Sequence, residues 1–336
     1  MRRIDCQHDI HTLDTGFIRS EFAAAYLVIE RGRAALIDCG STHSRSALLA
    51  AMAARGIAPA AVDYLIVSHV HLDHAGGAGA MLAHLPNARL VVHPRGAPHM
   101  IDPSRLIAGA TAVYGAERVA QDYGHVQPVP AERLIEAADG FQVDLAGRVL
   151  ECLDAPGHAR HHLVVWDARA RAFFTGDCFG VAYPDLDGSV GPLAIPTTTP
   201  VQFEPEAMVA TIGRMMARRP ETMYLTHFGS IPADPAIAVG LLRLIEEMVA
   251  AAEASARSEG SSHDLRERLA ALYLRRAREC GVSGSDAAIR ERLAVDIELN
   301  AQGLEVWRAR SHARSTVAAS HDRAGRLGRI VVPDGT

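Results

Sequence analysis

The chain of 336 residues, 49% of them hydrophobic, is long enough for one large domain with an extension or for two domains of ordinary size. Its 34 basic residues, all arginine, and 39 acidic residues give a net charge of −5, which does not favour a nucleic-acid partner. The five cysteines form no CxxC pair, so they predict a reducing compartment rather than a disulfide framework. The first residues hold no apolar signal region, and no window approaches the ~20 apolar residues of a membrane span, so we expect a cytoplasmic protein without a membrane partner.

Up to about residue 231, short β-like runs alternate with helical patterns, which indicates a layered α/β architecture. The predicted strands are AAYLVIE at 24–30, AALIDCG at 34–40 and YLIVSH at 64–69, and the predicted helices are RSALLAAMAARG at 45–56 and GAMLAHL at 79–85. Residues 141–157 and 161–178 each predict two strands about a turn, the first at Ala146 and Gly147 and the second near 167–171. These hairpins favour mixed sheets.

From about residue 235 the pattern becomes helical, with apolar residues at Leu241, Leu244, Ile245, Met248 and Val249. Breaks at SEGSSHD and GVSGSD supply capping residues and divide the region into three predicted helices. The last of these carries Ile289, Leu293, Ile297, Leu304 and Trp307, and we expect Trp307 in the core. We therefore divide the chain into a catalytic domain at 1–231, a helical extension at 232–314 and an irregular tail at 315–336.

The segment LIVSHVHLDHAGG, residues 65–77, places three histidines and an aspartate directly after an apolar run. In extended backbone His69 and His71 point the same way and can bind one ion, while the turn toward the glycine pair can direct Asp73 and His74 to a second. A surface loop rich in histidine is the alternative interpretation, but buried imidazoles rarely lack a partner. The spacing suits two adjacent metals.

Three later segments repeat this pattern, in which an apolar strand ends in a metal-competent residue beside a glycine. They are ECLDAPGH with His158, AFFTGDCFG with Asp177 and MYLTHFG with His227. Together they complete a ligand set for two metal ions.

The ordered series IDCG, SHVHLDHAGG, APGH, TGDCFG and LTHFG closely resembles the metallo-β-lactamase superfamily over about residues 10–231. The resemblance implies a four-layer αββα sandwich with metals at one edge, between its two sheets, followed here by an all-helical C-terminal extension. It implies that His69, His71 and His158 bind the first metal and that Asp73, His74 and His227 bind the second. Asp177 would then bridge both ions, and Asp38 would support the ligands without binding metal itself. Asp73 and Asp177 are the expected catalytic carboxylates.

The resemblance also implies a reaction. Two divalent ions, zinc in the first place with iron or manganese as alternatives, would lower the pKa of a bridging water so that hydroxide attacks a carbonyl substrate. The HLDH motif and the helical extension look most like the glyoxalase II type of hydrolase, whose substrates are glutathione thioesters. Those enzymes place basic residues, often lysine, around glutathione, and this chain has no lysine, so lactones and other esters stay open.

Two other classes of function compete with hydrolysis. Persulfide dioxygenases resemble this fold but use a single iron held by two histidines and a carboxylate. A ligand-binding protein with low turnover would keep the site, and its C-terminal helices would close the pocket. A nuclease lacks support in charge and motifs, and a class B β-lactamase would be expected to carry an export signal.

Few residues outside these motifs are candidates for contact with a small-molecule substrate. The segment 179–203 is rich in Gly, Pro and Thr, as a loop over an active site would be, and Tyr183 is its best candidate. Of the neighbours His161 and His162, at most one should face the site, and we choose His162. Cys178 is interpreted as a packed thiol. The helical extension is expected to cover the mouth of the site or to form a homodimer contact.

Overall fold

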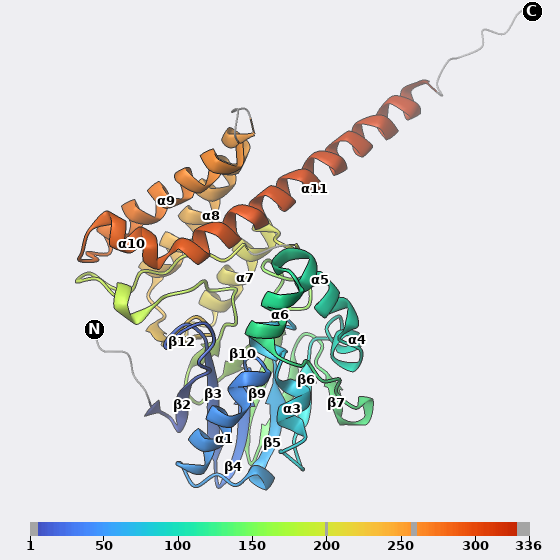
Figure 1. The fold of residues 1–336 in the computed structure, drawn as a ribbon, viewed down its shortest axis with the longest axis vertical. Coiled ribbons are helices and arrows are strands. Elements are labelled where there is room, and N and C mark those ends of the chain that lie inside the picture. The colour runs from blue at the N-terminus through green and yellow to red at the C-terminus, as the bar shows by residue number, and fades with distance from the viewer. Residues whose placement is uncertain (1–5, 199–200, 257–260, 328–336) are drawn as a thin grey trace, which may run out of the picture.

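The computed structural model describes residues 6–198, 201–256 and 261–327 of the chain, which form two mixed β-sheets flanked by helices (Figure 1). The first sheet runs in the order β1 (Cys6–Gln7), β2 (Ile10–Asp14), β3 (Ala24–Glu30), β4 (Arg33–Ile37), β5 (Val62–Ile66), β6 (Arg89–Val92) and β7 (Leu134–Glu136). The second runs in the order β13 (Gly229–Pro232), β12 (Thr222–Leu225), β11 (Ala172–Phe174), β10 (Leu163–Asp167), β9 (Arg148–Asp154) and β8 (Phe141–Leu145). The expected layered sandwich of mixed sheets is confirmed.

The helices lie on the outer faces of the sheets and at one end of the sandwich (Figure 1). They are α1 (Arg45–Ala53), α2 (Leu72–Ala75), α3 (Ala78–Leu82), α4 (Ala97–Ile101), α5 (Ser104–Tyr114), α6 (Ala116–Tyr123), α7 (Pro205–Ala217), α8 (Pro235–Ser255), α9 (Ser261–Glu279), α10 (Asp286–Arg292) and α11 (Ala294–Leu327). In the described part of the chain, no helix is both long and apolar enough to cross a membrane.

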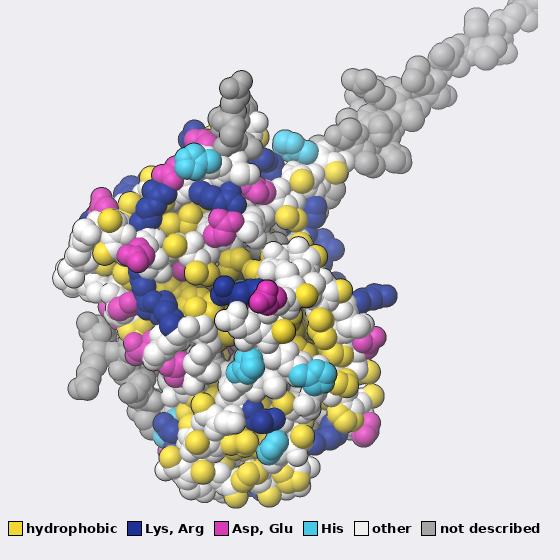
Figure 2. All heavy atoms as spheres, in the orientation of Figure 1, with side chains coloured by type: hydrophobic (Ala, Val, Ile, Leu, Met, Phe, Trp, Pro, Cys, Tyr) yellow, Lys and Arg dark blue, Asp and Glu magenta, His cyan; other side chains and the backbone are white. Residues whose placement is uncertain are grey.

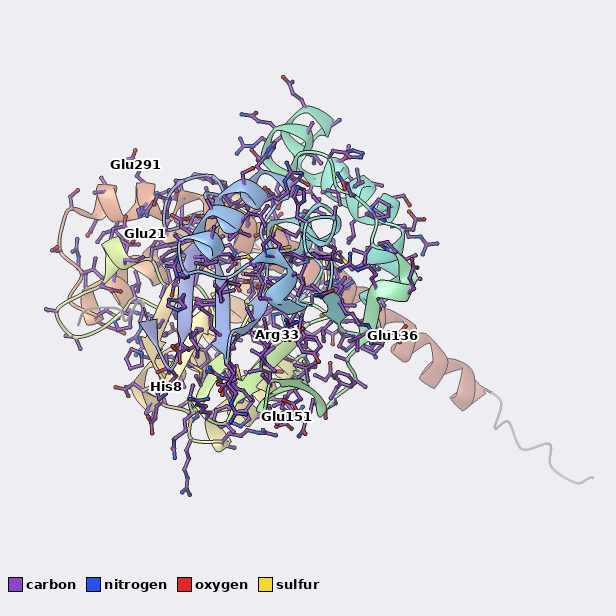
Figure 3. All side chains as sticks on the ribbon, turned by 90° about the horizontal axis from the view of Figure 1, so that it is seen from below. His8, Glu21, Arg33, Glu136, Glu151 and Glu291 are labelled. Carbon is purple, nitrogen blue, oxygen red and sulfur yellow. The ribbon has the colours of Figure 1, made fainter. Side chains whose placement is uncertain are left out.

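The side chains of β3 alternate between two apolar clusters, one on each face of the strand. Tyr26 and Val28 belong to the apolar cluster between the sheets, whereas Ala25 and Leu27 belong to the cluster beneath α1 and α3. Successive side chains of a strand point to opposite faces, so a strand buried on both sides is apolar throughout. Figure 3 views this sandwich from below, with Arg33 on β4 in one sheet and Glu151 on β9 in the other.

The turn between β8 and β9 confirms the first predicted hairpin. Ala146 and Gly147 have φ angles of 52° and 94°, the left-handed backbone that a tight turn between antiparallel strands requires. Glycine adopts this backbone without steric cost, and the amide of Gly147 donates to the Asp144 carboxylate. The second predicted hairpin is present as β10 and β11.

Within the described residues, the helical C-terminal region contains one more helix than the sequence predicted. The last predicted helix is divided at Leu293, whose φ of −96° and ψ of 8° separate α10 from α11. This bend lets Ile289, Leu293 and Ile297 all be buried, and no glycine, proline or serine marks it in the sequence. Ser285 caps α10 by accepting from the amide of Ala288, as the GVSGSD break predicted.

The irregular tail predicted from residue 315 is wrong for residues 315–327, which continue α11 away from the body of the molecule (Figure 1). A helix that leaves the body needs no apolar stripe, so its sequence lacks the periodicity that reveals packed helices, although alanine and arginine favour helix there. Residues 328–336 lie outside the described residues. Closer to the body, Leu304 and Trp307 of α11 are buried, so the core position expected for Trp307 is confirmed.

A buried ion pair joins β9 and β10 at the end of β9 away from His158. The Arg148 guanidinium on β9 donates from Nε to Asp167 Oδ2 on β10 over 2.9 Å, and it reaches the first sheet by donating from Nη1 to the carbonyl oxygen of His8, in the turn between β1 and β2, over 2.8 Å. Both charged side chains are fully buried. Asp167 also accepts from the amides of Arg169 and Ala170 in the β10–β11 turn.

We predict that Asp167→Ala lowers the free energy of unfolding by about 3–5 kcal/mol, because it leaves the Arg148 guanidinium buried and unpaired. Chemical denaturation measures the change. Glu221→Ala is the matched control, since it breaks an arginine–carboxylate pair with Arg171 that lies in solvent, and its expected cost is below about 1 kcal/mol. Equal losses in the two variants would contradict the prediction.

Candidate metal centre

The metal-competent residues all follow the carboxyl ends of strands, where the two sheets meet. His69 and His71 lie after β5, and Asp73 and His74 lie on the single turn of α2 that follows. The chain then passes close to the segment that contains Ser41. A Cβ on Gly77 would lie only 2.6 Å from the carbonyl oxygen of Ser41, so there is no room for a side chain at this position. His158, Asp177 and His227 follow β9, β11 and β12.

One group of ligand atoms lies around His71. Its Nδ1 is 2.8 Å from His69 Nε2 and 3.1 Å from His158 Nε2, and His158 Nε2 lies 3.4 Å from Asp177 Oδ2. The three imidazole nitrogens lie close enough together to hold one metal ion, and Asp177 Oδ2 stands beside them next to His158.

A second group lies on the other side of Asp177. Asp73 Oδ2 is 3.3 Å from His74 Nε2 and 3.4 Å from His227 Nε2, and His74 Nε2 lies 3.5 Å from Asp177 Oδ1. The two carboxylate oxygens of Asp177 therefore face different groups of ligands. The structure brings together all seven residues that the sequence proposed as ligands.

Two buried polar atoms without a partner among the described residues indicate that the ligand groups can hold divalent metal ions. In the described part of the chain, His74 Nε2 and Asp177 Oδ1 are buried without a hydrogen-bond partner. A buried polar atom left unpaired costs about 1–3 kcal/mol, and both of these atoms point into the ligand groups. A cation there would satisfy both.

The protonation of the histidines suits metal binding at the first group. Burial, followed by the neighbouring histidines, lowers the pKa of His69 well below its usual value, and burial and His158 lower that of His71 to about 3. Neutral imidazole is the form that binds metal. At His74, burial opposes the charged form, but the carboxylates of Asp73 and Asp177 outweigh it and raise the pKa well above its usual value.

The second ring nitrogen of four ligands is held by a partner outside the ligand groups. Thr197 Oγ1 lies 2.6 Å from His158 Nδ1, Ser68 Oγ lies 3.1 Å from His69 Nδ1, and His227 Nδ1 donates to the carbonyl oxygen of Phe22 over 2.9 Å. His74 Nδ1 donates to Asp38 Oδ2 over 3.3 Å. Such contacts fix the tautomer and orientation of a metal-binding imidazole.

Asp38 occupies the supporting position that the sequence assigned to it. Besides His74, its carboxylate accepts from the amide and hydroxyl of Ser68 and from the hydroxyl of Thr226. Asp38 is not among the described residues that line the cavity above the ligand groups, and its contacts are those expected of a residue that supports metal-binding side chains.

His162 and Cys178 lie near the ligands, but His162 does not line the cavity and Cys178 is not a thiolate ligand. His162 is fully buried and accepts from the amide of Asp177, and its neighbour His161, not His162 itself, lines the cavity above the ligands. The alternation along the chain predicted that one of the pair would face the site, but our choice of His162 was wrong. Burial raises the pKa of the Cys178 thiol, which donates to the carbonyl of Ala155, so Cys178 is a packed thiol.

A cavity of about 660 Å³ opens above the ligand groups. Its floor includes His71, Asp73, Asp177 and His227, and its walls come from α5, α6, α11 and the parts of the chain that hold Val181, Tyr183, Thr197, Val201 and Gln202. Tyr183 lines it as the sequence predicted, and its hydroxyl donates to Asp296 Oδ1 of α11 over 3.0 Å. Burial raises the pKa of Asp296 to about 6.

Sequence reasoning missed Thr197 and Asp296 at this site, and it preferred His162 to His161. Thr197 and Asp296 stand in no recognisable motif, and each reaches its partner only through the tertiary fold. A polar residue on an apolar helix face was the one available signal for Asp296, and it does not reveal the partner.

Comparison with known proteins shows which family the chain resembles. The sequence model of the Metallo-beta-lactamase superfamily matches residues 19–227. A metallo-beta-lactamase fold-containing protein from Sulfurisphaera tokodaii is 24% identical over 232 residues, which cover 66% of this chain and 79% of that protein. A hydroxyacylglutathione hydrolase from Aeromonas hydrophila is 28% identical over 105 residues, which cover 31% of this chain and only 29% of that protein.

Solved structures show the same fold. An archaeal metallo-beta-lactamase superfamily protein from Sulfolobus tokodaii has a TM-score of 0.60 at 22% identity, covering 89% of this chain and 99% of that chain. A peroxy diiron species of the chemotaxis sensor ODP has a TM-score of 0.50 at 17% identity, covering 72% of this chain and 93% of that chain. Identities this low carry the fold and no further property.

We predict that Thr197→Val weakens metal binding at least about tenfold, because the hydroxyl that orients His158 is removed while the side-chain shape is kept. Competition with a chelating dye for zinc measures the affinity. The control is Thr12→Val on β2, away from the ligand groups, which should bind zinc as the unaltered protein does. Unchanged affinity in Thr197→Val would show that the contact does not tune the site.

Proposed function

The chain belongs to the metallo-β-lactamase superfamily, and from this premise we propose that it is a binuclear metal-dependent hydrolase of thioesters, esters or lactones. The observation that carries the proposal is the position of Asp177, whose Oδ2 faces His158 in one ligand group and whose Oδ1 faces His74 in the other. A carboxylate between two such groups suits a pair of adjacent divalent ions, zinc in the first place.

Bound ions would supply a water of lowered pKa as the nucleophile and would polarise the substrate carbonyl. The protein's own residues hold the reacting atoms. Asp73 and Asp177 would balance the positive charge of bound ions, and the outer contacts of the histidines keep the ligand atoms in place. No serine nucleophile is needed in this arrangement.

Two side chains in the cavity are placed to orient the substrate. His161 lies beside His71 and is neutral, because burial and the nearby His71 lower its pKa to about 3. Asp296 Oδ2 is buried and, among the described residues, has no hydrogen-bond partner, while Oδ1 is bound by Tyr183. These groups offer hydrogen bonds to the polar part of a substrate whose carbonyl lies over the floor.

Thioesters are one candidate class because of the partial likeness to hydroxyacylglutathione hydrolase. That likeness spans less than a third of either chain, so ester and lactone hydrolysis stand beside it.

A mononuclear iron oxygenase is the second candidate. His69, His74 and Asp177 form a group of two histidines and one carboxylate, which is the ligand set of non-haem iron oxygenases. Metal analysis separates the candidates, because two ions per chain support hydrolysis, whereas one iron with oxygen consumption on a persulfide supports oxidation.

The compartment is part of the proposal. Four cysteines are buried and free of disulfides, namely Cys39, Cys152, Cys178 and Cys280. Free thiols are typical of a reducing compartment, and we propose the cytoplasm.

We predict that Asp177→Ala abolishes hydrolysis and lowers the metal content, because it removes the carboxylate between the two ligand groups. The measurements are metal analysis and a hydrolysis panel of thioesters, lactones and phosphodiesters on the same sample. Cys178→Ser is the neighbouring control and should be mild, since Cys178 is not a ligand. Full metal content and activity in Asp177→Ala would place the bridge elsewhere and defeat the proposal.

A further inference from the structure

The cavity above the metal centre is bordered by apolar side chains that are unusually exposed. Large apolar residues with 38–54% of their surface accessible line its rim, namely Ile18, Val113, Tyr114, Val201 and Val295. Figure 2 shows apolar side chains gathered on this face, between helix α11 and helices α5 and α6. Single exposed apolar residues are common, but a contiguous group around a hollow marks a binding site.

Helix α5 supplies one wall of the cavity with a continuous apolar stripe. Leu106, Ala110, Val113 and Tyr114 recur at the spacing of one helix face, and all of them line the cavity. No residue of α5 is fully buried. Leu106 and Ala110 pack partly against the apolar core, whereas Val113 and Tyr114 are exposed at the hollow. Val295 and Leu299 of α11 also line the cavity and form a second apolar wall.

The charges of the cavity do not favour an anionic carrier group. Arg118 of α6 is already paired with Asp122 of the same helix, and both line the cavity. Arg105 lies at the exposed rim, and Asp296 adds a buried carboxyl beside the floor. A glutathione or phosphate-bearing leaving group needs more than one cation to balance its charges.

We infer that the substrate is a neutral ester, thioester or lactone whose apolar acyl chain lies along the α5 stripe, with its carbonyl at the metal floor. The inference rests on the proposed hydrolase function for the position of the carbonyl. The hollow is continuous with the floor formed by His71 and Asp177, and its volume lies within the range of small-molecule sites. A flat protein interface would not need such a hollow.

The first test measures kcat/KM of the metal-loaded protein on p-nitrophenyl esters from butyryl to decanoyl. Burial of each methylene is worth about 0.8 kcal/mol when complete, so we expect kcat/KM to rise about two- to fourfold per added methylene. A second readout does not use activity. Displacement of the neutral dye Nile red should require much less decanamide than butanamide.

The variant Val113→Asp places a charge on the stripe at an exposed position, where the fold tolerates it. We expect it to lower the decanoyl-to-butyryl ratio of kcat/KM about tenfold, because the chain would lie against a charged group. Val239→Asp on α8 is the matched control, since Val239 is exposed and does not line the cavity, and its ratio should equal that of the unaltered protein.

The outcomes separate this inference from the proposed function. If both esters are hydrolysed with equal kcat/KM and decanamide competes no better than butanamide, the acyl-chain inference is overturned while hydrolysis stands. If no ester is hydrolysed but decanamide displaces Nile red and Val113→Asp prevents it, apolar-chain binding stands and the hydrolase proposal fails. If Val113→Asp turns a dimer into a monomer and leaves the ratio unchanged, the stripe is an interface between copies and the inference is overturned.

Discussion

The carboxylate of Asp38 is the contact through which the sandwich holds its metal ligands in place. It accepts from Ser68 after β5 over 2.7 Å and 2.9 Å, from Thr226 after β12 over 2.9 Å, and from His74 on α2 over 3.3 Å. One side chain thereby ties strand ends of both sheets to a histidine of the second ligand group. The backbone of Asp38 has a φ of 56°, an unfavourable conformation for a residue other than glycine. Four hydrogen bonds to its buried carboxylate account for its persistence, since strained backbone survives only where its surroundings determine it several times over.

The ligands could be proposed from sequence because each stands in a local pattern that is uncommon in segments without a ligand to bind. An apolar strand that runs into His69, Asp177 or His227 beside a tight turn places a costly polar group at the edge of a core. The fold was predictable for a related reason, since most of β3 and β4 is apolar on both faces and so belongs inside a layered structure. In both cases the decisive information lies within a few residues of the feature.

Other parts of the site depend on contacts that no local pattern contains. Thr197 reaches His158 across 39 residues of sequence, and Tyr183 reaches Asp296 across 113. The choice between His161 and His162 depended on which face of one short segment looks toward the cavity, and adjacent residues with identical side chains carry no difference from which to decide. The bend at Leu293 escaped prediction in the same way, because burial of its neighbours produces it and no helix-breaking residue marks it.

The C-terminal helices are coupled to the metal ligands by a short chain of contacts. Asn300 of α11 accepts from the amide of Thr198 over 2.7 Å and donates to the carbonyl of Pro196 over 3.0 Å. Thr197, held between these two anchored residues, contacts the outer nitrogen of His158. A shift of α11 would therefore move the segment that orients a ligand, as well as the cavity wall formed by Val295 and Leu299. The strand ends supply the ligand chemistry that superfamily membership implies, whereas α5 and α11 shape the cavity above it. This division explains why membership constrains the reaction more closely than the substrate.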